Sequence, residues 1–356
     1  MNFLSKLIFF LKKPKVIIVT GEGRACAVKA ISQVLGQRFE IGKDILIFEF
    51  ADKDIKGASF FLKKSQKPIL IVTRVGDIPF DKNFFDGEKE KIKNTSLLTK
   101  TLPEHTTLIL NFDDETTREI GDEIDLNTLT FGFQKEAAFK VSDVMVNGGT
   151  NFKLNHKGKI IPIWLKRVFG KEQIYSALTA IVVGTIFDLN LVEISQSLLG
   201  YHSLPGRMRL IKGIKNSWIL NDSESATTFS MIEALQVLGE LKDYKRKIAV
   251  LGDVIGVGKY TIEAHETIGE KVVKNADLLF TFGARARFIA KEAQSKGMAL
   301  EKVFQFDRVE EGKLKLQDEI KEGDIILIDG SQEMKMEKIV EEIRFQEKPM
   351  APSSSG

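Results

Sequence analysis

A glycine-containing segment, Gly21-Glu-Gly-Arg-Ala-Cys-Ala27, follows a predicted strand that ends at Thr20, and a predicted helix follows it. This is the setting in which phosphate-binding loops aim backbone N–H groups at a nucleotide. A working loop ends Gly-Lys-Ser/Thr, because the lysine neutralises the phosphates and the hydroxyl binds Mg²⁺. Arg24 could replace the lysine if one residue is deleted, but Ala25 then stands where the hydroxyl is needed. Glu22 adds a negative charge, so these residues favour a structural turn over a competent triphosphate site.

Two other features could suggest chemistry. The segment Gly252-Asp-Val-Ile-Gly-Val-Gly-Lys259 also follows a predicted strand, but Tyr260 stands at the hydroxyl position and the spacing is one residue too long for a phosphate loop. Cys26, near a helix start, could have a lowered pKa and act as a nucleophile. No motif supplies a base beside it, so a buried small residue is the simpler interpretation.

The elements that must position these residues recur in both halves of the chain. Short, nearly all-apolar runs bounded by glycine, proline or charge are typical of buried parallel strands. They lie at 16–19, 45–50, 68–73, 107–111, 218–220, 247–251, 277–281 and 324–328. Helical patterns with one apolar face lie between them, for example at 25–35, 170–187, 228–241 and 263–274. The alternation predicts two α/β units with mostly parallel sheets.

The chain of 356 residues is long enough for two domains. A long helical region gives way to a Pro-Gly segment at 200–206, which is the predicted boundary. We therefore expect an N-terminal amphipathic segment at 1–14, a first domain at 15–202, a second domain at 203–345 and a disordered tail at 346–356.

Composition and charge exclude several classes of protein. The 52 basic and 49 acidic residues are interspersed, so no basic stripe predicts nucleic-acid binding. The single cysteine excludes an intrachain disulfide and suits a reducing, cytoplasmic location. The apolar start of the chain is interrupted by Lys6 and ends well short of a membrane span, so we expect no transmembrane segment. Residues 1–13 could still contact a membrane surface weakly, although packing against the protein's own body is the simpler alternative.

Several motifs, taken together and in this order, resemble those of the Mur ligases, most closely the D-alanyl-D-alanine-adding members. The motifs are Leu204-Pro-Gly-Arg-Met208, Asn221-Asp-Ser223, Ile248-Ala-Val-Leu-Gly-Asp253, Glu263-Ala-His265, Asp277-Leu-Leu-Phe-Thr-Phe-Gly283, Gly330-Ser331 and Met334-Lys-Met-Glu-Lys338. The resemblance covers nearly the whole chain. It implies a central ATPase domain of the P-loop type, with a mostly parallel sheet, followed by a Rossmann-like α/β C-terminal domain.

The resemblance also implies a chemistry. In that family ATP phosphorylates a substrate carboxylate, and an amine attacks the acyl phosphate to form an amide. ATP and Mg²⁺ are the implied cofactors, and a peptidoglycan precursor is the implied substrate. The chain begins almost at the first central strand, so we expect it to lack the N-terminal uridine-nucleotide domain of typical members.

Site roles follow from the resemblance residue by residue. The implied nucleotide-binding residues are Thr20, Gly21, Gly23, Arg24 and Asp222, the implied metal ligand is Glu49, and the implied catalytic residues are Arg207, Asp222 and His265. For three of these residues a purely structural role is the alternative. Glu49 could be an ordinary strand-end acid, Arg207 could form a linker salt bridge, and His265 could be a hydrogen-bonding residue of a helix.

Departures from the family pattern fall on polar site positions. Family members carry Gly-Lys-Thr at Arg24-Ala25-Cys26 and a magnesium-associated histidine where Pro79 stands. They usually read His and Asn at Glu172 and Ser176, Tyr-Asn at Glu224-Ser225, and Glu at Gly256. They carry Lys-Gly-Ser-Arg-Gly where this chain has Asp329-Gly-Ser-Gln-Glu333.

Two hypotheses follow from the matches and the departures. The first is an ATP-dependent amide ligase of peptidoglycan precursor synthesis with a degenerate, weakly active site. The second is a non-catalytic pseudo-ligase that binds a precursor, a nucleotide or another Mur ligase. Losing one preorganised electrostatic contact can cost about 10²–10³ in rate, so we expect no normal turnover.

Overall fold

The structure is a computed structural model that describes residues 14–51, 55–75, 86–224 and 226–346. The chain divides into two compact units, residues 1–204 and 205–356. The expected N-terminal amphipathic segment, apart from Pro14, and the expected tail, apart from Gln346, lie outside the described residues. Among the residues that are described, no helix is long and apolar enough to cross a membrane.

Unit 1 is built on one eight-stranded sheet with the strand order β2-β1-β3-β4-β5-β6-β7-β8. Its strands are β1 Lys15–Thr20, β2 Ile45–Glu49, β3 Lys67–Val72, β4 Thr107–Asn111, β5 Asn127–Gly132, β6 Phe139–Val146, β7 Gly149–His156 and β8 Lys159–Lys166. Its helices are α2 Arg24–Leu35, α3 Ile55–Lys63, α4 Asp86–Thr99, α5 Glu115–Asp122, α6 Lys171–Ile186 and α7 Leu191–Leu198. Strands β1 to β6 are parallel, whereas β6, β7 and β8 form an antiparallel meander.

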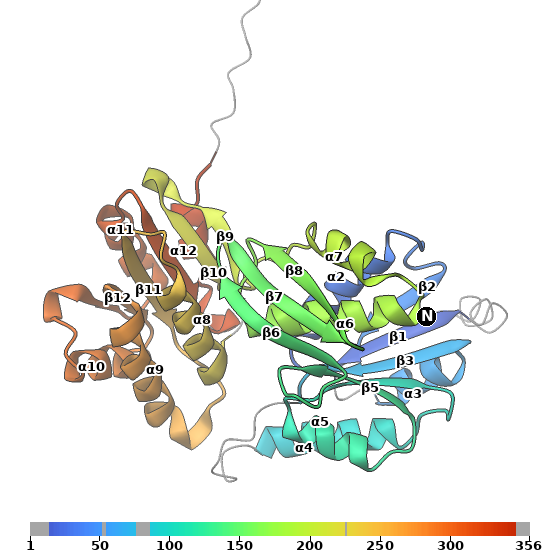
Figure 1. The fold of residues 1–356 in the computed structure, drawn as a ribbon. Coiled ribbons are helices and arrows are strands. Elements are labelled where there is room, and N and C mark those ends of the chain that lie inside the picture. The colour runs from blue at the N-terminus through green and yellow to red at the C-terminus, as the bar shows by residue number, and fades with distance from the viewer. Residues whose placement is uncertain (1–13, 52–54, 76–85, 225, 347–356) are drawn as a thin grey trace, which may run out of the picture. The chain divides into compact units, whose positions relative to one another are not determined.

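Helices cover both faces of the parallel part of this sheet (Figure 1). Alternate residues of β1 point to opposite faces, because side chains alternate along a strand. Ile17 and Val19 pack with α2 and α6, whereas Val16 and Ile18 pack with α3 and α4. The expected all-apolar runs are therefore explained by burial on both sides.

Unit 2 contains a six-stranded sheet with the order β13-β12-β11-β14-β10-β9, in which only β9 is antiparallel. Its strands are β9 Arg209–Lys212, β10 Trp218–Asp222, β11 Arg246–Gly252, β12 Leu278–Phe282, β13 Val303–Phe306 and β14 Asp324–Asp329. Its α-helices are α8 Thr228–Glu240, α9 Thr261–Asn275, α10 Arg287–Ser295, α11 Val309–Glu319 and α12 Glu337–Ile343, and short 3₁₀ turns lie at Ile214–Asn216, Gly258–Tyr260, Leu300–Lys302 and Gln332–Met334. Two α/β units with mostly parallel sheets are thus present, as the sequence predicts.

Candidate functional site

The candidate phosphate loop is hydrogen-bonded to the residues that follow the neighbouring strand β3. The backbone N–H of Glu22 donates to the carbonyl oxygen of Arg74 at 2.7 Å, and the Arg74 guanidinium donates to the Glu22 carboxylate at 2.6 and 3.1 Å. The Thr73 hydroxyl lies within hydrogen-bonding distance of the carbonyl oxygens of Thr20 and Glu22. A Cβ added at Gly21 (φ 97°) would lie 2.5 Å from the Arg74 carbonyl oxygen. The loop and the strand end therefore form one closed packing unit.

Arg24, the basic side chain of the loop, makes a hydrogen bond within the loop itself. Arg24 donates from its guanidinium to the carbonyl oxygen of Gly21 at 3.3 Å. Gly23 has the left-handed φ of 71° at the N-cap of α2, and a Cβ added there would lie 2.8 Å from Cγ of Glu172. Oε1 of Glu172 is buried and has no hydrogen-bond partner within the described part of the chain. A carboxylate of the protein thus lies against the helix start where an anionic phosphate would bind.

Cys26 belongs to a buried hydrogen-bonded cluster behind the loop. Its side chain is 1% exposed, and Nε2 of Gln173 lies 3.5 Å from its Sγ atom. The Tyr201 hydroxyl donates to Oε1 of Gln173 at 2.8 Å. Burial raises the pKa of Tyr201 well above its ordinary value, so its proton stays in place. Cys26, which stands where the family pattern carries a threonine, is therefore a buried packing residue, in agreement with the simpler interpretation.

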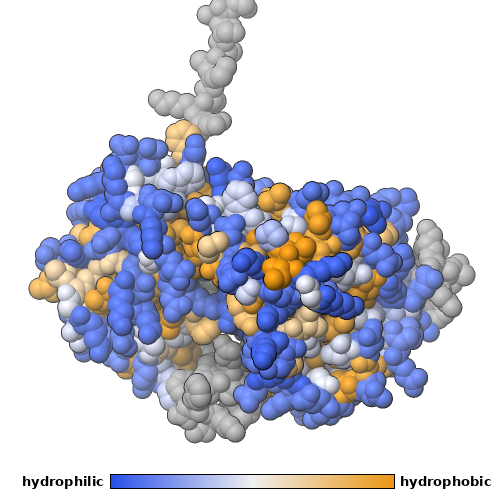
Figure 2. Space-filling view, viewed as in Figure 1, coloured by the Kyte–Doolittle hydropathy of each residue, from blue (hydrophilic) through white to orange (hydrophobic). Residues whose placement is uncertain are grey.

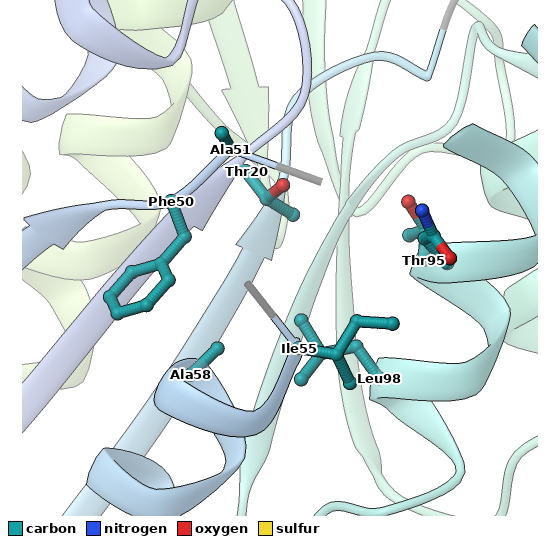
Figure 3. Close-up of a pocket in the computed structure, with 8 residues that line it drawn as sticks. Thr20, Phe50, Ala51, Ile55, Ala58, Thr95 and Leu98 are labelled. Carbon is teal, nitrogen blue, oxygen red and sulfur yellow. The ribbon is translucent and has the colours of Figure 1, made fainter. Parts of the chain in front are cut away.

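The space beside Thr20 is small and mostly apolar. Figure 3 shows Thr20 and Thr95 with Phe50, Ile55 and Leu98 around a pocket at the ends of β1 and β2. Its volume of about 10 Å³ is at the limit for a single water molecule.

Glu49 ends β2, pairs in register with Val19 and is exposed, as a strand-end acid should be. Over the ranges that the structure describes, no group of three or more His, Cys, Asp or Glu side chains is placed to hold a metal ion. The implied role of Glu49 as a Mg²⁺ ligand stays a prediction.

A buried pair of carboxyl groups lies at the carboxyl ends of two adjacent strands in unit 2. Asp222 and Asp329 are register partners on the parallel strands β10 and β14. Oδ1 of Asp222 accepts from the backbone N–H of Met208 at 3.0 Å. Asp329 is 0% exposed, and its side-chain oxygens make no hydrogen bond of ordinary geometry within the described residues. Burial and then the Asp222 carboxylate raise the pKa of Asp329 well above its ordinary value, whereas the backbone N–H of Gly330 and the Arg207 guanidinium oppose this shift. Burial therefore favours the neutral, protonated form of Asp329.

His265 is fully buried, and both of its ring nitrogens are engaged. The backbone N–H of Val254 donates to Nε2 at 3.1 Å, and Nδ1 lies 2.6 Å from the carbonyl oxygen of Thr261. This arrangement requires a neutral ring that carries its proton on Nδ1. Burial accordingly lowers the pKa of His265. His265 joins α9 to the loop after β11, which is the hydrogen-bonding alternative to the implied catalytic role.

The structure thus brings together only part of the predicted site. Thr20, Gly21, Gly23 and Arg24 form one loop, and Arg207 and Asp222 share a cluster with Asp329. Two acidic side chains, Glu22 and Glu172, lie at this loop. Reasoning from sequence missed Arg74 as the partner of Glu22, although its position at the end of the strand beside β1 was an available signal.

Two family profiles match the chain. The Mur ligase middle domain matches residues 40–184, and the Mur ligase glutamate ligase domain matches residues 206–332. The first match begins after the loop at residues 20–24. The UDP-N-acetylmuramoyl-tripeptide–D-alanyl-D-alanine ligase of Bacillus subtilis is 28% identical over 232 residues, which are 63% of this chain and 50% of the relative. The Escherichia coli protein of the same name is 27% identical over 193 residues, which are 54% and 41%. The chain spans about half the length of the curated relatives it matches.

Solved structures support the same fold. The MurF ligase of Thermotoga maritima in complex with ADP superposes with a TM-score of 0.76 at 18% identity, covering 95% of this chain and 82% of that one. A pseudomurein peptide ligase type C from Methanothermus fervidus gives a TM-score of 0.66 at 17% identity, with coverage of 96% and 81%. The predicted fold class is therefore confirmed.

Proposed function

Because the chain belongs to the Mur ligase family, we propose that it descends from the ATP-dependent D-alanyl-D-alanine-adding ligases and acts in cytoplasmic peptidoglycan precursor synthesis without normal ATP turnover. In this proposal it is a pseudo-ligase that works by binding a precursor or another Mur ligase. The carrying observation is the pair of carboxylates at the candidate loop, Glu22 and Glu172.

Amide formation through an acyl phosphate needs cations where negative charge spreads in the transition state. Glu22 takes up the Arg74 guanidinium, and Arg24 donates to the Gly21 carbonyl oxygen. Glu172 stands where the resemblance implies a histidine, and it lies against Gly23. The first two contacts engage guanidinium groups that could otherwise face a phosphate. The third places a carboxyl group where a phosphate would bind.

The second unit supports the same proposal independently. Asp329 stands where the resemblance implies a lysine, next to Asp222. A lysine there would pair with Asp222, whereas a second carboxyl group must be neutral to stay buried. Asp329 therefore supplies neither a cation nor a charged partner at this strand end.

Isothermal titration calorimetry with Mg²⁺–ATP tests the proposal. We expect the unaltered chain to show no binding, or weak binding that does not respond to Mg²⁺. Replacing the loop with the family residues (Arg24→Gly, Ala25→Lys, Cys26→Thr) should raise affinity only slightly while Glu172 remains. Adding Glu172→His should raise it at least tenfold more, because a carboxylate beside the phosphates is removed.

The matched control is Glu172→His alone, which should bind no better than the unaltered chain, and thermal unfolding checks that each variant is folded. Tight, Mg²⁺-dependent binding by the unaltered chain would overturn the proposal. It would favour the second candidate, a weakly active amide ligase, which the nearby placement of Arg207 and Asp222 supports.

A further inference from the structure

The antiparallel meander β6–β8 has one buried and one exposed face. Phe152 and Leu154 of β7 and Ile163 and Leu165 of β8 belong to the core of unit 1. The strand register places the intervening side chains on the opposite face, which we call the outer face of β6–β8. One row across it is Met145, Asn151 and Trp164.

This outer face carries large apolar side chains. Met145 is 64% exposed, Ile160 is 61% exposed and Trp164 is 40% exposed. Figure 2 shows an apolar patch over the region where Figure 1 labels β7 and β8, with hydrophilic residues around it. The solvent face of an antiparallel sheet is normally polar, so a contiguous apolar group there indicates a surface that another body covers.

The same strands concentrate positive charge. Residues 139–166 hold five lysines and a single acid, Asp143, whereas the whole chain of 356 residues has a net charge of only +3. Asp143 pairs with Lys153 at 2.9 Å. Lys166 ends β8 on the outer face together with Ile160 and Trp164, and the exposed Lys159 begins the strand next to Ile160. The exposed apolar residues of β8 therefore have a lysine near each end of the strand.

We propose that the outer face of β6–β8 binds the surface of an anionic lipid bilayer. Tryptophan is enriched at the membrane–water interface because its ring is apolar with one polar edge. Lysines beside it can extend their ammonium groups to anionic headgroups while their methylenes contact apolar surface. Each such lysine contributes about fivefold in affinity.

Other occupants fit this face less well. A second copy placed face to face across a two-fold axis would bring the lysines of both copies together, which is unfavourable. An acidic protein would satisfy the lysines, but it would not by itself require exposed Trp164, Ile160 and Met145 between them. This inference is separate from the nucleotide loop, so either proposal can fail without the other.

Intrinsic fluorescence of the full chain tests the inference. Trp218→Phe leaves Trp164 as the single tryptophan. On titration with vesicles of equal parts phosphatidylglycerol and phosphatidylcholine, we expect a blue shift of the Trp164 emission and quenching by brominated lipid. Binding should weaken with added salt, and vesicles of phosphatidylcholine alone should bind at least tenfold more weakly.

Paired variants distinguish this face from the rest of the molecule. Lys159→Glu with Lys166→Glu should weaken binding at least tenfold, and Ile160→Ser should also weaken it. The control, Leu300→Ser with Lys302→Glu, alters an exposed apolar residue and an exposed lysine in unit 2 and should change binding less than twofold.

Three results would overturn the inference. The first is no binding to anionic vesicles at low salt, which would leave an acidic protein as the partner. The second is loss of binding in Phe9→Ser with Phe10→Ser while Lys159→Glu with Lys166→Glu still binds, which would assign the contact to residues 1–13. The third is a dimer in solution that Ile160→Ser dissociates.

Discussion

The two units keep charged groups at their strand ends in different ways. In unit 1 the Glu22 carboxylate forms an ion pair with the Arg74 guanidinium, and both side chains are partly exposed, at 29% and 18%. In unit 2 the Asp329 carboxyl is fully buried and holds its proton, and the buried His265 ring has lost one. The difference follows from solvent, because water near the loop supports an ion pair while a dry interior favours neutral forms.

This contrast predicts different sensitivities for the two units. Unit 2 should lose stability at both ends of the pH range, whereas unit 1 should respond to the loss of an ion pair. Each unit contains one of the two tryptophans, Trp164 in unit 1 and Trp218 in unit 2. Trp164→Phe and Trp218→Phe backgrounds therefore report the unfolding of each unit separately in urea.

His265→Ala should have the largest effect. It removes two buried hydrogen bonds and leaves a cavity, so the free energy of unfolding of unit 2 should fall by about 2–4 kcal/mol. In the unaltered chain the unfolded state takes up a proton below about pH 6.5 and the native ring resists it, so stability should fall as the pH is lowered. Urea unfolding at pH 5 and pH 7 should show this slope in the unaltered chain and in His202→Ala, an exposed control, but not in His265→Ala. An unchanged slope would contradict a buried neutral histidine.

Asp329→Asn should stabilise unit 2 by about 1–3 kcal/mol at pH 8, because a buried amide is neutral without keeping a proton that the unfolded state has lost. The native state of the unaltered chain keeps the Asp329 proton above about pH 4, where the unfolded state has lost it. Stability should therefore fall as the pH rises until the native carboxyl ionises, and Asp329→Asn should remove that fall. A destabilised variant at pH 8, with the pH dependence unchanged, would refute a protonated Asp329.

Arg74→Ala should lower the stability of unit 1 by about 1–2 kcal/mol, a value reduced by the partial exposure of the pair. Glu22→Ala with Arg74→Ala should recover part of this loss, because no unpaired carboxylate then remains. Urea unfolding followed by Trp164 measures the double-mutant cycle. If the stability loss of the double variant equals the sum of the losses of Glu22→Ala and Arg74→Ala, the ion pair does not stabilise the loop.

Glu49→Ala should have the smallest effect. The side chain is exposed, so the free energy of unfolding should change by less than about 0.5 kcal/mol. Mg²⁺ titrations followed by calorimetry should be the same for the variant and the unaltered chain. A lost magnesium signal in Glu49→Ala would instead restore its role as a ligand.

Most of the parallel framework was predictable, because strands buried on both faces read as apolar runs wherever they occur. The meander β6–β8 was not, since Ile160, Pro162 and Trp164 face outward and hide the alternation that marks an antiparallel strand. Glu22, Arg24 and Ala25 predict a degenerate phosphate loop from sequence alone. Its closure depends on Arg74, which is 52 residues from Glu22 in sequence. Similarly, the departure at Asp329 was visible in sequence, but its protonation depends on a register with Asp222 that only the fold provides.

The most direct test of the account is phosphate release from ATP by the purified full chain, supplied with Mg²⁺, a UDP-N-acetylmuramoyl-tripeptide and D-alanyl-D-alanine. A curated relative such as the Bacillus subtilis ligase serves as the positive control under the same conditions. The account predicts phosphate release at the level of a blank without protein. Magnesium-dependent release that requires both the tripeptide and the dipeptide would contradict it.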